Sequence, residues 1–335
     1  MKALGLTQAG GVEQLSELDL PCPQASGTDI LVAVKAISVN PVDTKVRQRP
    51  VPAGAEPVVL GWDAAGVVAE VGDEVTEFQV GDAVWYAGDL TRPGSNAEFQ
   101  LVDSALVGRK PKSLRFAEAA ALPLTAITAW ELLFDRLQLD KADAYAPRTV
   151  LVIGAAGGVG SVLLQLAKRL TNVTLIATAS RDETQQWVRE LGADRVINHH
   201  QSLSEQLAAA GIAQVDDVIS LTHTDQHLEE IVKVIAPQGR LALIDDPQSF
   251  DVLALKRKSI SLHWEFMYTR SMFDTEDKRQ QQVLLNRVAE MVDAGLVKTT
   301  LDQHFGAINL ENLRRAHALL ESGKAKGKIV LEGFA

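Results

Sequence analysis

The residues with the most specific chemical meaning are glycines that crowd one short stretch of the chain. Residues 154–160 contain four of them: Gly154, Gly157, Gly158 and Gly160. The apolar run 150–153 precedes this stretch, and Val162, Leu163 and Leu166 follow it at helical spacing. A strand, a glycine turn and a helix in this order suit a phosphate group, because glycine lets the backbone approach closely and the first amides of a helix attract anions.

The glycine spacing departs from the usual G-x-G-x-x-G pattern of dinucleotide sites. An ordinary glycine-rich turn is therefore the alternative, but the strand before the turn and the amphipathic helix after it favour a dinucleotide. The residues expected to line the phosphate site are Gly154, Ala156, Gly157, Gly158, Val159 and Gly160.

Polar residues after the next predicted strands bear on which dinucleotide is bound. Ser180 and Arg181 follow the predicted strand 174–179, where an NAD-binding protein usually carries an acidic residue for the ribose 2′-hydroxyl. A hydroxyl and a guanidinium suit a 2′-phosphate instead. His199 and Thr222, each after a later predicted strand, complete the candidate site. We predict NADPH rather than NADH; the alternative is that Ser180 caps the next helix and Arg181 is only exposed to solvent.

The elements around the glycine turn alternate between strand and helix. Six predicted strands cover residues 150–153, 174–179, 195–197, 215–220, 240–244 and 259–264. Predicted helices at 184–191, 202–210 and 225–236 lie between them. This alternation predicts an α/β fold with a doubly wound Rossmann domain built on a parallel six-stranded sheet.

The first part of the chain has a different character. Up to about residue 106, short β-branched runs alternate with Gly and Pro turns and no long helix occurs, which indicates a compact β-rich domain. After residue 264, helices at 277–294 and 309–320 and a strand at 328–331 carry no phosphate-binding pattern, so we expect this tail to complete the first domain. The predicted domains are 1–123 with 265–335, and 124–264.

The composition of the chain restricts the classes of partner and the compartment that we expect for the protein. The 335 residues carry a net charge of −10, which does not favour binding to nucleic acid or anionic membranes. Cys22 is the single cysteine, so no disulfide forms within the chain, as expected in a reducing compartment. No run approaches the 18 or so apolar residues of a membrane span, and we expect no signal peptide and a cytoplasmic protein.

Several short motifs together resemble one known family. They are Asn40-Pro41-Val42-Asp43, Gly61-Trp62-Asp63-Ala64-Ala65-Gly66-Val67-Val68, Val80-Gly81-Asp82-Ala83-Val84, the glycine turn and Gly323-Lys324-Ala325-Lys326-Gly327-Lys328-Ile329-Val330. They are similar to the quinone oxidoreductase branch of the medium-chain dehydrogenase/reductase superfamily. Residues 220–227 and 259–266 are similar to its zinc-type alcohol dehydrogenase-like subgroup. The resemblance implies a GroES-like catalytic domain, a Rossmann domain and a homodimer that pairs through residues 264–268.

The name of that subgroup raises the question of zinc. The resemblance implies that zinc-dependent relatives place a Cys in the segment 40–43, a His-Glu pair at Trp62-Asp63, and a Cys or Asp near Thr125. None of these metal ligands occurs at the matching positions of this chain, and one cysteine cannot form a four-cysteine structural site. We therefore predict that no metal is bound.

Without a metal, reduction of a conjugated carbonyl is easier than oxidation of an alcohol, because the oxyanion needs only hydrogen-bond donors and a proton. The expected function is hydride transfer from NADPH to a quinone or an α,β-unsaturated carbonyl, a small-molecule substrate. Candidate catalytic residues are Asn40 as a donor to the substrate, Asp43 as a proton donor, Trp62 as an aromatic wall and Thr125 beside the nicotinamide.

These assignments have alternatives. Asp43 could simply cap a helix, and Trp62 could simply pack in the core. Two other functions also fit parts of the sequence: a zinc-dependent alcohol dehydrogenase, and a non-enzymatic NADPH-binding sensor or structural protein.

Overall fold

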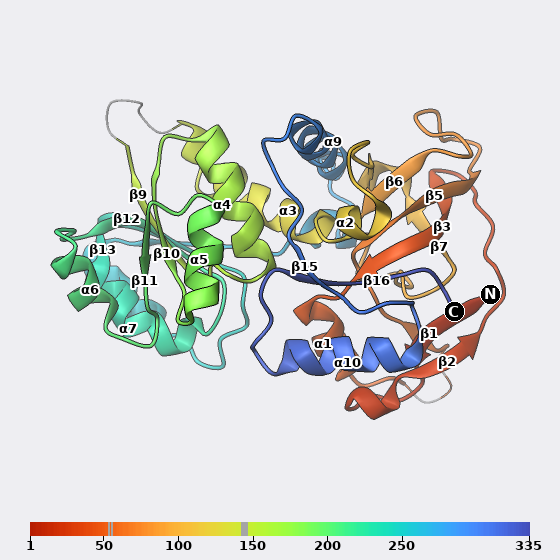
Figure 1. Cartoon of the computed structure of the whole chain (residues 1–335), viewed down its shortest axis with the longest axis horizontal. Coiled ribbons are helices and arrows are strands. Elements are labelled where there is room, and N and C mark those ends of the chain that lie inside the picture. The colour runs from red at the N-terminus through yellow and green to blue at the C-terminus, as the bar shows by residue number, and fades with distance from the viewer. Residues whose placement is uncertain (53, 55, 142–146) are drawn as a thin grey trace. The chain divides into compact units, whose positions relative to one another are not determined.

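The computed structural model describes residues 1–52, 54, 56–141 and 147–335 (Figure 1). The chain divides into two compact units. The first contains residues 1–127 and 268–335, and the second contains residues 128–267. The C-terminal tail thus belongs to the same unit as the N-terminal part of the chain.

The second unit is built on a sheet of six strands. They are β9 (Thr149–Ile153), β10 (Thr174–Thr178), β11 (Arg195–Ile197), β12 (Val215–Ser220), β13 (Ile235–Leu243) and β14 (Ser261–Trp264). Their order is β11-β10-β9-β12-β13-β14, and every neighbouring pair is parallel. The predicted doubly wound parallel sheet is confirmed. The strand order reverses at β9, and ligands of such sheets bind outside the carboxyl ends of the strands at that point.

Within residues 147–267, the connections between these strands contain the α-helices α4 (Gly158–Leu170), α5 (Asp182–Glu190), α6 (Leu203–Ala209) and α7 (Thr224–Val234), and a 3-10 helix at Val252–Lys258 between β13 and β14. Helices α6 and α7 cover one face of the sheet, where Leu207 and Ile231 share a buried apolar cluster with Leu151 and Val218. Right-handed crossovers place α4 and α5 on the opposite face. Figure 1 shows these two helices beside each other, and the Trp187 indole donates to the Ser161 hydroxyl at 2.8 Å between them.

One predicted helix ends earlier than the sequence indicates. The predicted helix 225–236 stops at Val234, because Ile235 is fully buried and pairs with Val215 as the first residue of β13. A shift in register accommodates Pro237 early in that strand. Helix α3 (Pro123–Trp130) is followed directly by a π-helix at Glu131–Arg136.

The first unit contains two sheets. The smaller has the order β2-β1-β4, with β1 (Lys2–Leu6), β2 (Ser16–Asp19) and β4 (Val58–Val59). The larger has the order β15-β16-β3-β5-β6-β8, and β7 also pairs with β3. Its strands are β3 (Asp29–Ser38), β5 (Ala64–Val71), β6 (Ala83–Tyr86), β7 (Phe99–Asp103), β8 (Val107–Arg109), β15 (Leu301–His304) and β16 (Lys328–Glu332). The tail joins this unit because β16 pairs antiparallel with β3.

The helices of the first unit include α1 (Pro41–Arg47), α2 (Phe116–Ala120), α8 (Thr269–Met272), α9 (Gln280–Asp293) and α10 (Leu310–Glu321). In Figure 1, α1 and α10 lie side by side, and the buried Arg47 guanidinium joins them through His317 Nδ1 at 3.0 Å and through Glu321. By length and composition the stretch Phe116–Arg136 could cross a membrane, but 83% of its apolar window is buried inside the structure, as in the core helix of a globular protein.

Candidate cofactor and catalytic sites

The glycine turn joins β9 to α4 as its residues predict. Gly154 has φ of +78°, which favours glycine, and its amide donates to the Thr178 hydroxyl at 3.0 Å. Helix α4 begins at Gly158 after Gly157, so the first amides of a 13-residue helix have no partner within the helix. A Cβ atom on Gly160 would lie 2.4 Å from the Ala155 carbonyl oxygen. The turn and the helix can therefore pack this closely only with glycine at that position, and the residues fit a bound pyrophosphate.

Thr222 lies directly against this turn. It follows β12, and a Cβ atom on Gly154 would come within 2.8 Å of its methyl group. Its hydroxyl bonds to His223 Nδ1 at 2.6 Å. The structure therefore brings one predicted cofactor residue from a distant strand to the glycine turn, at the carboxyl edge of the sheet.

The residues predicted to face a 2′-phosphate follow β10 and β11. The last paired residues of these strands are Thr178 and Ile197, and the Ala179 amide donates to the Ile197 carbonyl at 3.0 Å. Ser180 and His199 each come two residues after this pair, so the two strands deliver them to the same sheet edge. His199 is half-buried, and burial together with neighbouring histidines lowers its pKa to about 4.

Arg181 stands at the start of α5 and is exposed. The hydrogen bonds at this helix start come from Thr184, whose hydroxyl donates to the Arg181 carbonyl at 2.8 Å and accepts from its amide at 3.2 Å. Thr184 and not Ser180 therefore supplies the cap. The alternative role that the sequence left for Ser180 is wrong, whereas the exposure expected for Arg181 is present.

Asn40 and Asp43 lie where β3 passes into α1 in the first unit. The Asn40 amide donates to Asp43 Oδ2 at 2.8 Å, which is the helix cap that the sequence allows as an alternative for this residue. Asp43 is fully buried, and within the described part of the chain its Oδ1 has no hydrogen-bond partner. Burial raises the pKa of Asp43 from 3.8 to about 7, although the Asn40 amide and Lys328 oppose the shift. This carboxyl group can therefore exchange a proton near neutral pH.

A buried network of charges surrounds these two residues and was not singled out from the sequence. Lys328 Nζ lies 3.0 Å from Asp63 Oδ2, donates to the Val39 carbonyl at 3.0 Å and bonds to Asn40 Oδ1. Lys328 and Asp63 had appeared in the sequence only as members of family motifs. A lysine and an aspartate are normally exposed, so nothing in their local sequence indicates that they are paired in the core.

The network occupies the polar atoms of Asn40. Its side-chain Nδ2 donates to Asp63 Oδ2 at 3.2 Å and to the Ser38 carbonyl at 3.4 Å, while its side-chain Oδ1 accepts from Lys328. In this arrangement Asn40 positions the start of α1 and offers no spare donor to a substrate. The role predicted for Asn40 as a direct donor is therefore not what the geometry favours.

Trp62 and Thr125 are sequence neighbours of residues in this network: Trp62 precedes Asp63, and Thr125 follows Leu124, which bonds to Asp63. Trp62 is 1% exposed and its indole donates to the Asp89 carbonyl at 3.0 Å, which is the core-packing alternative. Thr125 is buried in the first turns of α3, where its hydroxyl donates to the Leu122 carbonyl at 3.0 Å. The preceding amide, that of Leu124, donates to Asp63 Oδ1 at 3.1 Å. Asp63 thus joins the segments that carry all four predicted catalytic residues.

The residues of this network do not form a metal site. Over the residues that the structure describes, no three side chains of His, Cys, Asp or Glu are grouped so that they could hold a metal ion. Catalytic zinc needs three protein ligands. Asp63 instead has the ammonium group of Lys328 beside it, so the donor set does not fit zinc.

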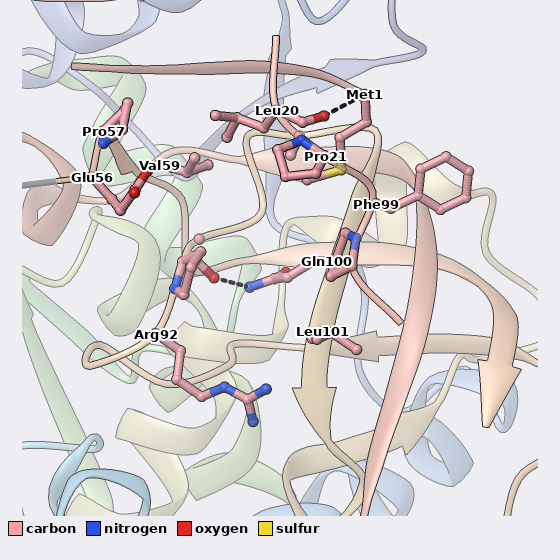
Figure 2. A pocket seen from close by; sticks show the side chains of 14 residues that line it. Met1, Leu20, Pro21, Glu56, Pro57, Val59, Arg92, Phe99, Gln100 and Leu101 are labelled. Atoms are coloured by element: carbon pink, nitrogen blue, oxygen red, sulfur yellow. Dashed lines mark hydrogen bonds between the residues drawn. The ribbon is translucent and has the colours of Figure 1, made fainter. Parts of the chain in front are cut away.

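A separate apolar cavity of about 300 Å³ opens in the first unit. Figure 2 shows Met1, Leu20, Pro21, Phe99 and other side chains around it, with Gln100 donating to the Pro93 carbonyl at 3.0 Å. None of its lining residues belongs to the predicted sites. The cavity is therefore lined by residues other than those on which the predicted chemistry depends.

A β-rich unit and a doubly wound unit with a glycine turn define the class of two-domain oxidoreductases that use a nicotinamide cofactor. Comparison with known families supports this class. Residues 26–112 match the alcohol dehydrogenase GroES-like domain, and residues 191–331 match the zinc-binding dehydrogenase family.

Individual proteins extend the match over the whole chain. A zinc-type alcohol dehydrogenase-like protein of Staphylococcus epidermidis is 38% identical over 99% of both chains. The chloroplastic NADPH-dependent alkenal/one oxidoreductase of Arabidopsis thaliana is 32% identical over 99% of this chain and 79% of its own. The chain belongs to the medium-chain dehydrogenase/reductase superfamily.

Solved structures agree with this assignment. A Rhizobium etli CFN 42 protein provisionally named a zinc-dependent alcohol dehydrogenase is 53% identical, with a TM-score of 0.96 over 100% of this chain and 98% of its own. The Escherichia coli quinone oxidoreductase, solved with NADPH, is 25% identical, with a TM-score of 0.84 over 99% of this chain and 100% of its own. The resemblance recognised in the sequence is confirmed, the protein is an oxidoreductase of this superfamily, and these neighbours indicate a nicotinamide cofactor.

Proposed function

We propose that the protein is an NADPH-dependent reductase of quinones or α,β-unsaturated carbonyls that works without zinc. The observation that carries the proposal is the buried network of Asn40, Asp43, Asp63 and Lys328. The family resemblance implies metal ligands in the segment 40–43 and at Trp62-Asp63 of zinc-dependent relatives, and in this chain the ammonium group of Lys328 lies beside Asp63 instead. The names of the Arabidopsis and Escherichia coli proteins support the two substrate classes.

The second unit would bind the cofactor. The glycine turn and the first amides of α4 suit the pyrophosphate, and Ser180 with Arg181 suits a 2′-phosphate, since no acidic side chain stands at that position. When bound, the nicotinamide supplies the hydride. The sheet edge beside the turn would orient the ligand, and Thr222 lies against Gly154 of the turn.

The first unit would supply the proton. Asp43 has a pKa of about 7 and an oxygen, Oδ1, without a hydrogen-bond partner among the described residues. A carboxyl group with these properties retains a proton near neutral pH and can deliver it to a developing oxyanion. Lys328, Asn40 and Asp63 position the start of α1, where Asp43 lies.

Titration with NADPH and NADH, followed by turnover of a panel of quinones and enones, tests the proposal. Arg181→Ala should weaken NADPH by about tenfold to a hundredfold and leave NADH unchanged, because a charge-assisted bond to phosphate is worth about 1.5–3 kcal/mol. Arg189→Ala, an exposed arginine on the same helix, is the control. Equal losses for both nucleotides would refute the role of Arg181, and tight binding without turnover would favour a sensor.

A zinc-dependent alcohol dehydrogenase is the second candidate, because the Rhizobium etli relative carries that name. Elemental analysis of the purified protein separates the two. Stoichiometric zinc, with alcohol oxidation that a chelator abolishes, would replace the reductase proposal.

We also propose a homodimer that pairs through β14, an edge strand of its sheet. Trp264 and Phe266 support this, since they are 52% and 45% exposed at the end of that strand, whereas Met267 is buried. Light scattering should report a dimer for the natural protein and a monomer for Phe266→Glu. Phe273→Glu, at an exposed position in the other unit, is the control.

A further inference from the structure

Four histidines gather at the carboxyl edge of the sheet in the second unit. His199 and His200 follow β11, His223 precedes α7 and His227 lies in the first turns of that helix. The ring centroid of His199 lies 4.5 Å from that of His200 and 6.3 Å from that of His227, and both ring pairs are in edge-on orientation. We call these four residues the histidine cluster.

Two members of the histidine cluster, His199 and His227, have lowered pKa values, so the folded protein disfavours their charged forms. Burial, and then the proximity of His200, His227 and His223, lowers the pKa of His199 to about 4. The pKa of His227 is lowered mainly by burial, with His223 and His200 adding to the effect, while Asp225 and Asp245 act in the opposite direction. Arg181 is the basic residue that follows the neighbouring strand β10.

The central ring has an unsatisfied polar atom. His199 Nδ1 is buried and has no hydrogen-bond partner within the described ranges of the chain. Buried polar atoms are bonded in most native structures, and an exception often marks a place that a ligand or an ion completes. Ser180 and His199 each follow the paired residues Thr178 and Ile197 by two positions, at the same edge of the sheet. An anion held by Ser180 and Arg181 would therefore lie near the cluster and could accept a hydrogen bond from a protonated imidazole.

We propose that the histidine cluster takes up a proton when the 2′-phosphate of a nucleotide binds beside Ser180 and Arg181, so that the preference for NADPH over NADH strengthens as the pH falls. The proposal rests on the proposed function in one respect, namely that NADPH binds at the glycine turn. The four residues of the histidine cluster would then contribute to the preference of the cofactor site for NADPH over NADH.

The direction of the pH effect follows from the charges. A phosphate monoester is a dianion above its second pKa of about 6, and it stabilises an imidazolium that the cluster otherwise disfavours. The pKa of the cluster is therefore higher in the complex than in the free protein. Uptake of one proton makes the affinity rise about tenfold for each unit of decreasing pH until about pH 6, below which the phosphate itself is protonated.

The proton count can be measured directly. Calorimetry with adenosine 2′,5′-bisphosphate, in buffers that differ in ionisation enthalpy, should give an uptake of about one proton near pH 7. Adenosine 5′-monophosphate, which lacks the 2′-phosphate, should give an uptake near zero. The ratio of the NADPH and NADH dissociation constants should change about tenfold per pH unit over the same range, because NADH is insensitive.

Variants assign the effect to the cluster. His199→Asn should abolish the proton uptake and the pH dependence of the NADPH/NADH affinity ratio, and His227→Asn should reduce both. His304→Gln, an exposed histidine in the first unit, is the control and should keep the full effect. Circular dichroism verifies that each variant is folded.

Two results would overturn the proposal. One is NADPH binding whose preference over NADH does not change with pH, and the other is full proton uptake in His199→Asn. In both cases the proposed reductase function survives, because NADPH still binds. If neither nucleotide binds to the natural protein, the proposed function fails and this proposal fails with it.

Discussion

Replacement of Lys328 by methionine tests the buried network of the first unit. Lys328 Nζ lies 3.0 Å from Asp63 Oδ2, and the side chains are 4% and 0% exposed, so solvent screens the pair little. At an effective dielectric constant of about 20, Coulomb attraction at this distance is about 5 to 6 kcal/mol. The cost of burying both charges offsets much of this in the intact pair. Removal of one partner leaves a buried carboxylate unpaired and should destabilise the unit by about 3–5 kcal/mol.

Urea denaturation followed by circular dichroism measures this effect. Lys328→Met should lower the unfolding midpoint strongly, and the double variant Lys328→Met with Asp63→Asn should recover part of the loss, because no unpaired charge remains. Lys35→Met, at an exposed position on β3 of the same unit, is the control and should change stability by less than about 0.5 kcal/mol.

The same variant changes a titration. The positive charge of Lys328 lowers the pKa of Asp43 and so limits the rise that burial causes. Its loss should move the decreasing limb of the pH profile of kcat/KM from about pH 7 to higher pH. A loss of stability below about 1 kcal/mol, or a double variant no more stable than the single one, would refute the reasoning about the buried pair.

Three other variants probe separate parts of the fold. Burial raises the pKa of Asp43 from 3.8 to about 7, so its protonated form stabilises the fold below about pH 4. This contribution is lost as the pH rises through about 7. The melting temperature of Asp43→Asn should therefore lack the decrease that the natural protein shows over this pH range. Gly160→Ala should destabilise the second unit by about 1–3 kcal/mol and abolish nucleotide binding, because its Cβ would overlap the Ala155 backbone. Gly157→Ala is the control for folding in a thermal melt, because a Cβ there would lie 3.6 Å from its nearest neighbour, the Gly154 carbonyl oxygen. Arg47→Met removes a buried cation between α1 and α10 and should cost about 3 kcal/mol in denaturation; an unchanged midpoint would show that this contact contributes nothing.

The features that depend on neighbouring residues could be predicted from the amino-acid sequence. The apolar run before Gly154 and the helical spacing after Gly160 predict β9, the turn and α4, because each element carries its own periodicity. Alternation of strands and helices then leads to the parallel sheet, since short crossovers leave little choice of topology. The family motifs are equally local, and they sufficed to identify the superfamily.

The contacts of the functional side chains could not be predicted in this way, because they join residues that are far apart in the chain. Lys328 and Asn40 are separated by 288 positions, and they meet because β16 pairs with β3, an event that no local pattern encodes. Lys328 from β16 and Asp63 beside β5 together occupy the side-chain amide of Asn40, so the geometry favours Asn40 as a positioning residue rather than a substrate donor. Asp43 is fully buried in the same fold. The histidine cluster likewise forms because two strands end at one edge of a sheet. Burial and long-range charge are properties of the assembled fold, and they set the pKa values on which the chemistry depends.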